Sequence, residues 1–159
     1  MKIRIVSIGK IKEKYLLAGI DEYKKRLGAF TKIEMVELED EKIPDKASLA
    51  DEQLVLDKEG KKILDRIKDD EYVILLDLYG KEIDSVQLSK HIETKMIEGK
   101  STITFVIGGS LGLAKDVVAR SNFRLCFSKL TFTHQMIRLF LLEQIYRSFK
   151  IMNNQTYHK

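Results

Sequence analysis

The chain has 159 residues, 44% of them hydrophobic and 33% charged, which is enough for one domain (residues 1–159) with a full core. No run of about 18 apolar residues is present, and Met1–Ile5 passes directly into a strand pattern, so we expect neither a membrane span nor a signal peptide. Cys126 is the only cysteine, which excludes an intrachain disulfide. Its apolar neighbours favour a buried thiol, and we expect a cytoplasmic protein.

The net charge of +4 is unevenly distributed along the sequence. From Arg120 to Lys159 there are seven basic residues and one acidic residue, a net charge of +6, whereas the preceding residues together carry −2. A basic segment of this kind favours a polyanionic partner, with nucleic acid as the first candidate. A basic surface that only contacts solvent explains the charge equally well, so both interpretations stay open.

Strand and helix patterns alternate along the whole chain. The predicted strands cover 2–8, 32–38, 72–76, 102–107 and 123–127. The predicted helices cover 13–27, 49–67, 85–99, 116–120 and 135–152. This alternation, with the continuous apolar run Tyr72–Leu76 and a second buried strand at 102–107, predicts a single α/β domain with a mainly parallel sheet and flanking helices.

Small and polar residues mark several element ends. Gly28 is expected to stop the first helix, Ser85 to cap a later helix at its N-terminus, and Gly99 to end that helix. The charged segment 39–50, which holds the only proline, is expected to form a loop. Gly60 falls inside a predicted helix, where glycine is usually unfavourable.

Two loops near the C-terminus form the most informative part of the sequence. Phe105–Gly112 reads as a buried strand that enters a glycine-rich turn, and Phe127–Gln135 reads as a strand end followed by a polar loop. Loops that leave neighbouring strand ends form the usual ligand crevice of an open α/β sheet. No Gly-Lys-Ser/Thr follows the glycines, which excludes a P-loop, and no Gly-x-Gly-x-x-Gly follows the first strand.

Other chemistry-bearing residues give weaker signals. No group of Cys, His, Asp and Glu has the spacing of metal ligands, so we expect no metal site. Ser128, Thr131 and Thr133 resemble a hydroxyl-lined loop without a defensible Ser–His–acid arrangement. The last helix carries an apolar band wider than one core face requires, which favours a partner subunit over complete burial.

Several motifs in fixed order resemble the RlmH family of SPOUT-class methyltransferases. They are Ile8-Gly9-Lys10, Gly108-Gly109-Ser110-x-Gly112, Phe127-Ser128-x-x-Thr131, His134-Gln135-Met136-x-Arg138, Glu143-Gln144-x-Tyr146-Arg147 and Tyr157-His158-Lys159. The resemblance covers essentially the whole chain. Two positions depart from the family pattern: Thr133 replaces an expected proline, and Asn153-Asn154-Gln155 replaces a glycine-containing turn.

The resemblance implies an enzyme that uses S-adenosyl-L-methionine to methylate N3 of a pseudouridine in the 23S rRNA of the assembled ribosome. It also implies a homodimer in which a trefoil knot of the C-terminal backbone forms the cofactor pocket. Nothing in the periodicity predicts the knot, because threaded chains are rare. Carried over by position, the residues expected around the cofactor are Leu76, Gly108, Phe127, Ser128, Lys129, Leu130, Thr131 and Phe132.

Methyl transfer from a sulfonium needs in-line geometry and a dry pocket more than a covalent nucleophile. The acceptor N3–H must be deprotonated or its developing anion stabilised, tasks suited to His158, Tyr157 or Arg138. The basic C-terminal third would then hold RNA phosphates. Two alternatives stay open, a non-catalytic ribosome-associated protein with the same fold and a small-molecule enzyme that binds another nucleotide. The two crevice loops and the intact C-terminal tail, Tyr157-His158-Lys159, argue against the non-catalytic alternative.

Overall fold

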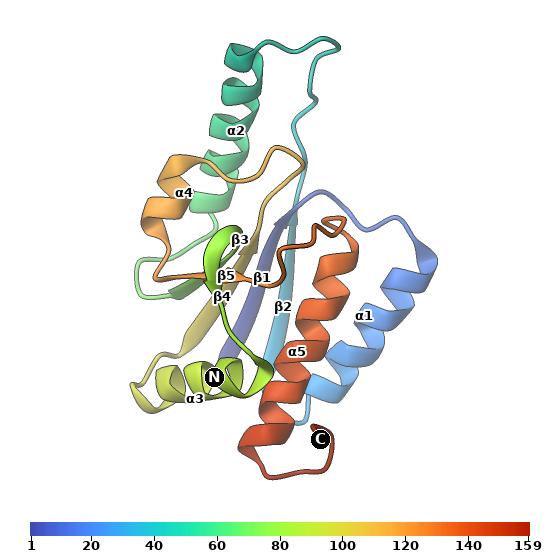
Figure 1. Cartoon of the computed structure of the whole chain (residues 1–159), viewed down its shortest axis with the longest axis vertical. Helices are drawn as coiled ribbons and strands as arrows, with labels where there is room; N and C mark the ends of the chain where they lie inside the picture. The colour runs from blue at the N-terminus through green and yellow to red at the C-terminus, as the bar shows by residue number, and fades with distance from the viewer.

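The computed structural model describes all residues from Met1 to Lys159, with strands and helices in alternation (Figure 1). The strands are β1 (Lys2–Ile8), β2 (Lys32–Leu38), β3 (Tyr72–Glu82), β4 (Thr102–Ile107) and β5 (Phe123–Cys126). The helices are α1 (Lys14–Leu27), α2 (Leu49–Leu64), α3 (Ser85–Ile97), α4 (Lys115–Arg120) and α5 (Met136–Met152). Every predicted element is present, and the largest difference is that β3 continues to Glu82 instead of ending at Leu76.

All five strands form one sheet in the order β2-β1-β4-β3-β5, and every neighbouring pair is parallel. The predicted α/β class is confirmed, and the sheet is wholly rather than mainly parallel. Nearly all of β4 and residues 73–75 of β3 are buried, as expected for strands covered on both faces. The threading of the C-terminal backbone into a trefoil knot stays a prediction of the resemblance.

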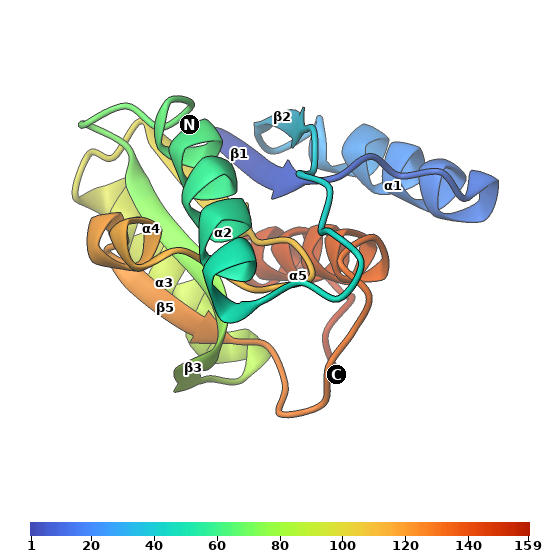
Figure 2. The ribbon, with the colours of Figure 1, turned by 90° about the horizontal axis from the view of Figure 1, so that it is seen from above.

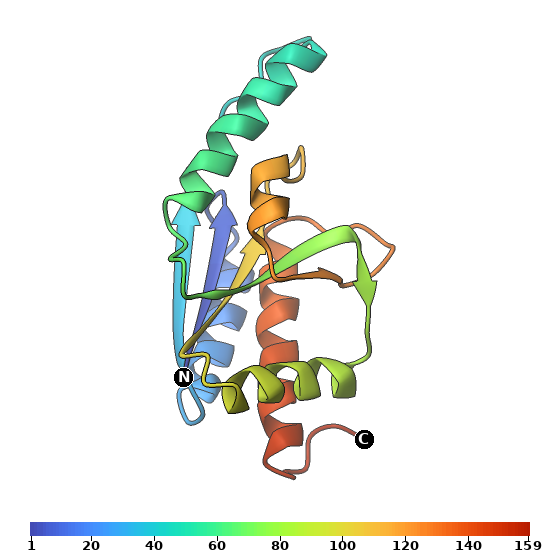
Figure 3. The ribbon, with the colours of Figure 1, turned by 90° about the vertical axis from the view of Figure 1, so that its left-hand side faces the viewer.

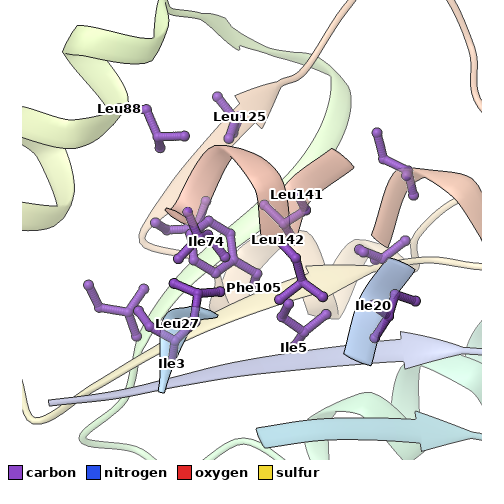
Figure 4. Packing of buried hydrophobic residues seen from close by; sticks show 14 of the residues in the cluster. Ile3, Ile5, Ile20, Leu27, Ile74, Leu88, Phe105, Leu125, Leu141 and Leu142 are labelled. Carbon is purple, nitrogen blue, oxygen red and sulfur yellow. The ribbon is translucent and has the colours of Figure 1, made fainter. Parts of the chain in front are cut away.

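Helices cover both faces of the sheet and create two separate apolar cores. One core joins the sheet to α1, α3 and α5, and the other joins it to α2 and α4 (Figure 2). In the first core, side chains such as Ile5, Phe105 and Leu142 converge between β1, β4 and α5 (Figure 4). This core fixes α5, and therefore the loop that precedes α5, against the centre of the sheet.

The helix boundaries correct two details of the sequence prediction. Asp84, not Ser85, caps α3, because its side chain accepts the backbone N–H of Gln87 while the Gln87 side chain accepts the N–H of Asp84. Gly60 has a packing reason inside α2: a Cβ at this position would lie 2.7 Å from the Cβ of Ala114. Gly60 therefore lets α2 approach the segment that leads into α4.

The loops that follow the strands and the C-terminal tail lie on opposite sides of the molecule (Figures 1 and 3). The carboxyl ends of the strands face the loops 108–114 and 127–135, and the C-terminal tail lies at the opposite end of α5 (Figures 1 and 3). α2 projects beyond the sheet on the side of the loops (Figure 3). None of the helices combines the length and the apolar character needed to cross a membrane.

Candidate functional site

A cavity of about 520 Å³ lies at the carboxyl ends of β4 and β5 and beside the middle of β3. It is lined by residues 76–79, by residues 107–113, by most of 127–132, and by Val118, Arg124, His134 and Ile137. Its size falls within the range of cavities that bind small molecules and cofactors. The two loops singled out in the sequence therefore meet at one cavity, as predicted.

The glycine-rich loop folds closely on itself at the wall of this cavity. A Cβ at Gly108 would lie 2.5 Å from the carbonyl oxygen of Gly112 and 2.9 Å from the Leu113 side chain. Gly112 has φ of +90°, a backbone conformation that other residues rarely adopt. The requirement for glycine at these two positions thus comes from the loop itself, before any ligand is considered.

The residues of the second loop, 127–132, differ in whether they line the cavity. Phe127, Ser128, Leu130, Thr131 and Phe132 all line the cavity. The Lys129 side chain does not line it, because this side chain is 85% exposed and its Nζ lies 3.6 Å from Glu82 Oε1. The Ser128 hydroxyl accepts the backbone N–H of Leu130 at 3.0 Å, which tightens the turn around Lys129.

Sequence reasoning missed an ion pair in the cavity wall. Arg124 on β5 donates from Nη2 to Asp77 Oδ2 at 2.6 Å, and from Nε to the same oxygen at 2.7 Å. Close contact between the two strands is possible because Gly80 has no side chain, since a Cβ there would lie 2.6 Å from the Arg124 backbone. Asp77 directly follows the apolar run of β3, a position at which a polar side chain reaches the ligand edge of a parallel sheet.

His134 and Arg138 connect the cavity to the core. Arg138 is fully buried and does not line the cavity, although the sequence suggested that it acts on the acceptor base. Its Nη2 donates to the Ile8 carbonyl at 2.7 Å and its Nε to the His134 carbonyl at 2.9 Å. Burial lowers the pKa of His134, and the charge of Arg138 lowers it further. Arg138 thus ties α5 to the end of β1, while neutral His134 faces the cavity.

The carboxyl group of Glu59 lies next to the glycine loop. Glu59 of α2 is 5% exposed and accepts the backbone N–H of Glu41 at 3.2 Å. Its Oε2 lies so near the loop that a Cβ at Gly109 would be 2.9 Å away. Burial raises the pKa of Glu59. α2 was predicted as a helix, but its contact with the loop was not.

The C-terminal tail folds back along α5 and stays away from the cavity of its own chain. The Tyr157 hydroxyl donates to Glu143 at 3.0 Å, and His158 Nδ1 lies 3.3 Å from Arg147 Nη1. Arg147 follows Ile137 by ten residues of α5, a rise of about 15 Å along the helix axis. No residue after Ile137 lines the cavity. The predicted cofactor loops and the predicted catalytic tail are therefore separate in one chain.

Comparison with known proteins identifies the family of the chain. The family described as predicted SPOUT methyltransferase matches residues 1–158. The chain belongs to the SPOUT methyltransferase family. Within this family, it is 57% identical to the ribosomal RNA large subunit methyltransferase H of Clostridium botulinum (strain Alaska E43 / Type E3) and 55% identical to that of Clostridium perfringens (strain 13 / Type A). Both alignments cover 159 residues and the full length of each chain.

The fold is shared with a solved structure of a more distant protein. A solved structure, that of a probable methylase family protein from Haemophilus influenzae Rd KW20, superposes with a TM-score of 0.52 at 15% sequence identity. The alignment covers 99% of this chain and 70% of the other. At this identity the likeness extends to the fold alone.

SPOUT methyltransferases use S-adenosyl-L-methionine, and the cavity of this chain fits such a cofactor. The volume suits a nucleoside with an amino-acid side arm. The glycine loop offers backbone rather than side chains at the cavity wall. Of the 20 lining residues, 11 are hydrophobic, Leu76 and Ile137 among them. Neutral His134 adds no positive charge that would repel a sulfonium.

Proposed function

We propose that this SPOUT methyltransferase methylates N3 of a pseudouridine in 23S rRNA of the large ribosomal subunit, in the cytoplasm. The observation that carries the proposal is the single cavity formed at the strand ends by the two loops that carry the family motifs. Relatives named ribosomal RNA large subunit methyltransferase H match the chain from end to end, and the net charge of +6 after residue 119 suits a polyanionic substrate.

In this proposal, the cofactor lies among Leu76, Gly108 and the loop 127–132. Bound S-adenosyl-L-methionine supplies a methyl group activated by its attachment to a positive sulfur. The chain supplies orientation, because the backbone of the glycine loop is fixed by its own contacts. Lys129 belongs to this set through its position in the loop, with its side chain directed away from the cavity toward Glu82.

We further propose that the acceptor site is completed by a second copy of the chain. His158 and Tyr157 are held along α5, beyond reach of their own cavity, so a tail that acts on the acceptor base must come from a partner. α1 and α3 cover much of the apolar band of α5, but Leu130, Phe132 and Phe140 remain exposed beside the cavity. These three side chains provide an apolar surface for a homodimer.

The reaction is tested with purified ribosomes from cells that lack this protein. Addition of the protein and S-adenosyl-L-methionine should produce one new methylated nucleoside in 23S rRNA, which mass spectrometry of nuclease digests identifies as a pseudouridine with a methyl group on N3. Free 23S rRNA serves as the comparison substrate. A methyl group on another nucleoside, or none on either substrate, would exclude the proposed reaction.

The shared site is tested by mixing two inactive variants. Gly108→Val blocks the cavity and deletion of 157–159 removes the tail, so a mixed dimer contains one intact cavity and one intact tail. If the acceptor site is shared, co-expressed variants recover part of the wild-type activity, while each variant alone stays inactive. Light scattering should give about twice the chain mass for every preparation. Absence of recovery in a confirmed mixed dimer would refute the shared site.

A further inference from the structure

Two residues of α5, Glu143 and Arg147, hold the tail through a network of hydrogen bonds. Arg147 Nη2 donates to Glu143 Oε1 at 2.6 Å, and its guanidinium carbon lies 4.7 Å from the centre of the Tyr157 ring. The Tyr157 ring also meets Tyr146 edge to face at 5.0 Å. Both charged side chains are mostly buried, with 20% of Glu143 and 25% of Arg147 exposed. The network therefore restrains the tail, although chain ends are usually frayed.

The contact between Arg147 and His158 fixes the chemistry that the imidazole can offer. A guanidinium has only donors, so His158 Nδ1, 3.3 Å from Arg147 Nη1, must accept with its lone pair. The proton of the neutral ring is then on Nε2. His158 is exposed, which leaves this N–H available to another molecule. Held in this way, His158 is a hydrogen-bond donor and has no free lone pair to accept a proton.

Tyr157 is also committed by its contacts. Its hydroxyl proton goes to Glu143 Oε1 at 3.0 Å, and the Tyr23 hydroxyl at 3.3 Å is then the donor to the Tyr157 oxygen. Burial and the bonds with Tyr23 and Glu143 raise the pKa of Tyr157. A phenol in this state is an anchor for the tail and is unsuited to act as a base at neutral pH.

We propose that Glu143 and Arg147 are positioning residues that make the tail a hydrogen-bond donor. This deepens the proposed function and rests on it. As N3 of the acceptor loses its proton to water and forms the bond to the methyl carbon, the sulfur keeps the electron pair of the broken carbon–sulfur bond. During this step, His158 Nε2–H donates to a ring carbonyl oxygen on which negative charge develops. Tyr157 holds His158 in place and takes no proton.

The chain contains a matched control for this network. Glu22 and Arg26 of α1 form an ion pair with the same i,i+4 spacing, 2.8 Å long, but 44–50% exposed and without a bond to the tail. Glu22→Gln removes the same type of contact and should leave methyl transfer unchanged. Arg147→Lys keeps a positive charge near Glu143 but replaces the planar guanidinium with a single ammonium nitrogen. The variant therefore loses the arrangement in which Nη2 bonds Glu143 while Nη1 bonds His158.

The first test is nuclear magnetic resonance of the full chain with ¹⁵N-labelled histidine, which does not depend on the reaction. The wild type should show His158 with an unprotonated, hydrogen-bonded Nδ1 and a protonated Nε2. In Arg147→Lys and Arg147→Met, the Nδ1 resonance should move to the position of an unbonded nitrogen, while Glu22→Gln should match the wild type. An unchanged Nδ1 resonance in Arg147→Met would overturn the positioning role, whatever the reaction proves to be.

The second test is the rate of methyl transfer to ribosomes. Arg147→Lys, Glu143→Gln and Tyr157→Phe should each lower kcat by about 10- to 100-fold, the range for a misplaced catalytic group, with the KM for S-adenosyl-L-methionine unchanged. Because Glu143 and Tyr157 share one bond, their double variant should lose little more than either single variant. Multiplicative losses would assign Tyr157 an independent role and refute the proposal. Absence of methyl transfer by the wild type would instead refute the proposed function.

Discussion

The two ends of α5 carry two different kinds of site. At the N-terminal end, the cavity is shaped by backbone: a side chain at Gly108 would collide with the loop itself, and Gly112 has a φ of +90°. At the C-terminal end, the tail is held by side chains, through carboxylate, guanidinium and phenol contacts. A backbone-shaped cavity is sensitive to steric change, whereas a network of polar side chains is sensitive to the loss of single donors and acceptors. Substitutions at the cavity should therefore abolish cofactor binding, whereas changes in the tail should reduce methyl transfer and leave cofactor binding unchanged.

The largest effect is expected at the cavity. Gly108→Val places a branched side chain where a Cβ alone would lie 2.5 Å from the Gly112 carbonyl, so the loop must move and S-adenosyl-L-methionine binding should be lost. Calorimetry measures the affinity, and far-UV circular dichroism should remain close to the wild type. Gly99→Ala, at the end of α3, is the control for backbone strain away from the cavity: its φ is +82° but no atom lies within 4 Å of its Cβ, so it should lower stability slightly and leave the affinity unchanged. Wild-type affinity in folded Gly108→Val would place the cofactor elsewhere.

Deletion of Tyr157, His158 and Lys159 should reduce methyl transfer without changing cofactor binding. Methyl transfer to ribosomes should fall by at least about a hundredfold, the low end for loss of a group that acts directly on the transferred proton or charge. Cofactor affinity should stay at the wild-type value, because no tail residue lines the cavity. A truncated protein that methylates normally would remove the tail from the reaction, and reduced cofactor affinity would contradict the separation of the two ends.

Arg138 ties the N-terminal end of α5 to the end of β1, and its loss should affect folding before chemistry. Arg138→Met removes a fully buried side chain and leaves the buried Ile8 carbonyl and the partly buried His134 carbonyl without this donor. Because each unsatisfied buried group costs about 1–3 kcal/mol, we expect the free energy of unfolding to fall by about 2–4 kcal/mol. Urea denaturation measures this loss. A stable variant with lost activity would instead support the catalytic role suggested by the sequence.

The sequence was informative where one residue determines local structure and less so where distant residues meet. The strands, the parallel arrangement and the meeting of the two loops followed from hydrophobic patterns and from the geometry of parallel sheets. The burial of Arg138, the pairing of Asp77 with Arg124 and the approach of Glu59 to the glycine loop did not. Each depends on how elements pack across the sheet, which periodicity does not encode.

The smallest expected effect comes from Glu59 behind the cavity wall and concerns pH. Burial raises the pKa of Glu59 in the folded chain, so the folded state binds more protons than the unfolded state between the two pKa values. The protonated Glu59 side chain therefore contributes its whole stabilising effect below its pKa in the unfolded chain, about 4.3. This contribution to the free energy of unfolding is lost as pH rises through the raised pKa of Glu59 in the folded chain. Glu59→Gln removes this dependence and leaves the other carboxylates unchanged. The free energy of unfolding of the wild type minus that of Glu59→Gln, measured in urea at a series of pH values, should fall as pH rises from 4 toward neutrality. A difference that rises with pH would mean that the folded chain stabilises the Glu59 carboxylate, and that Glu59 supports the glycine loop through its charge.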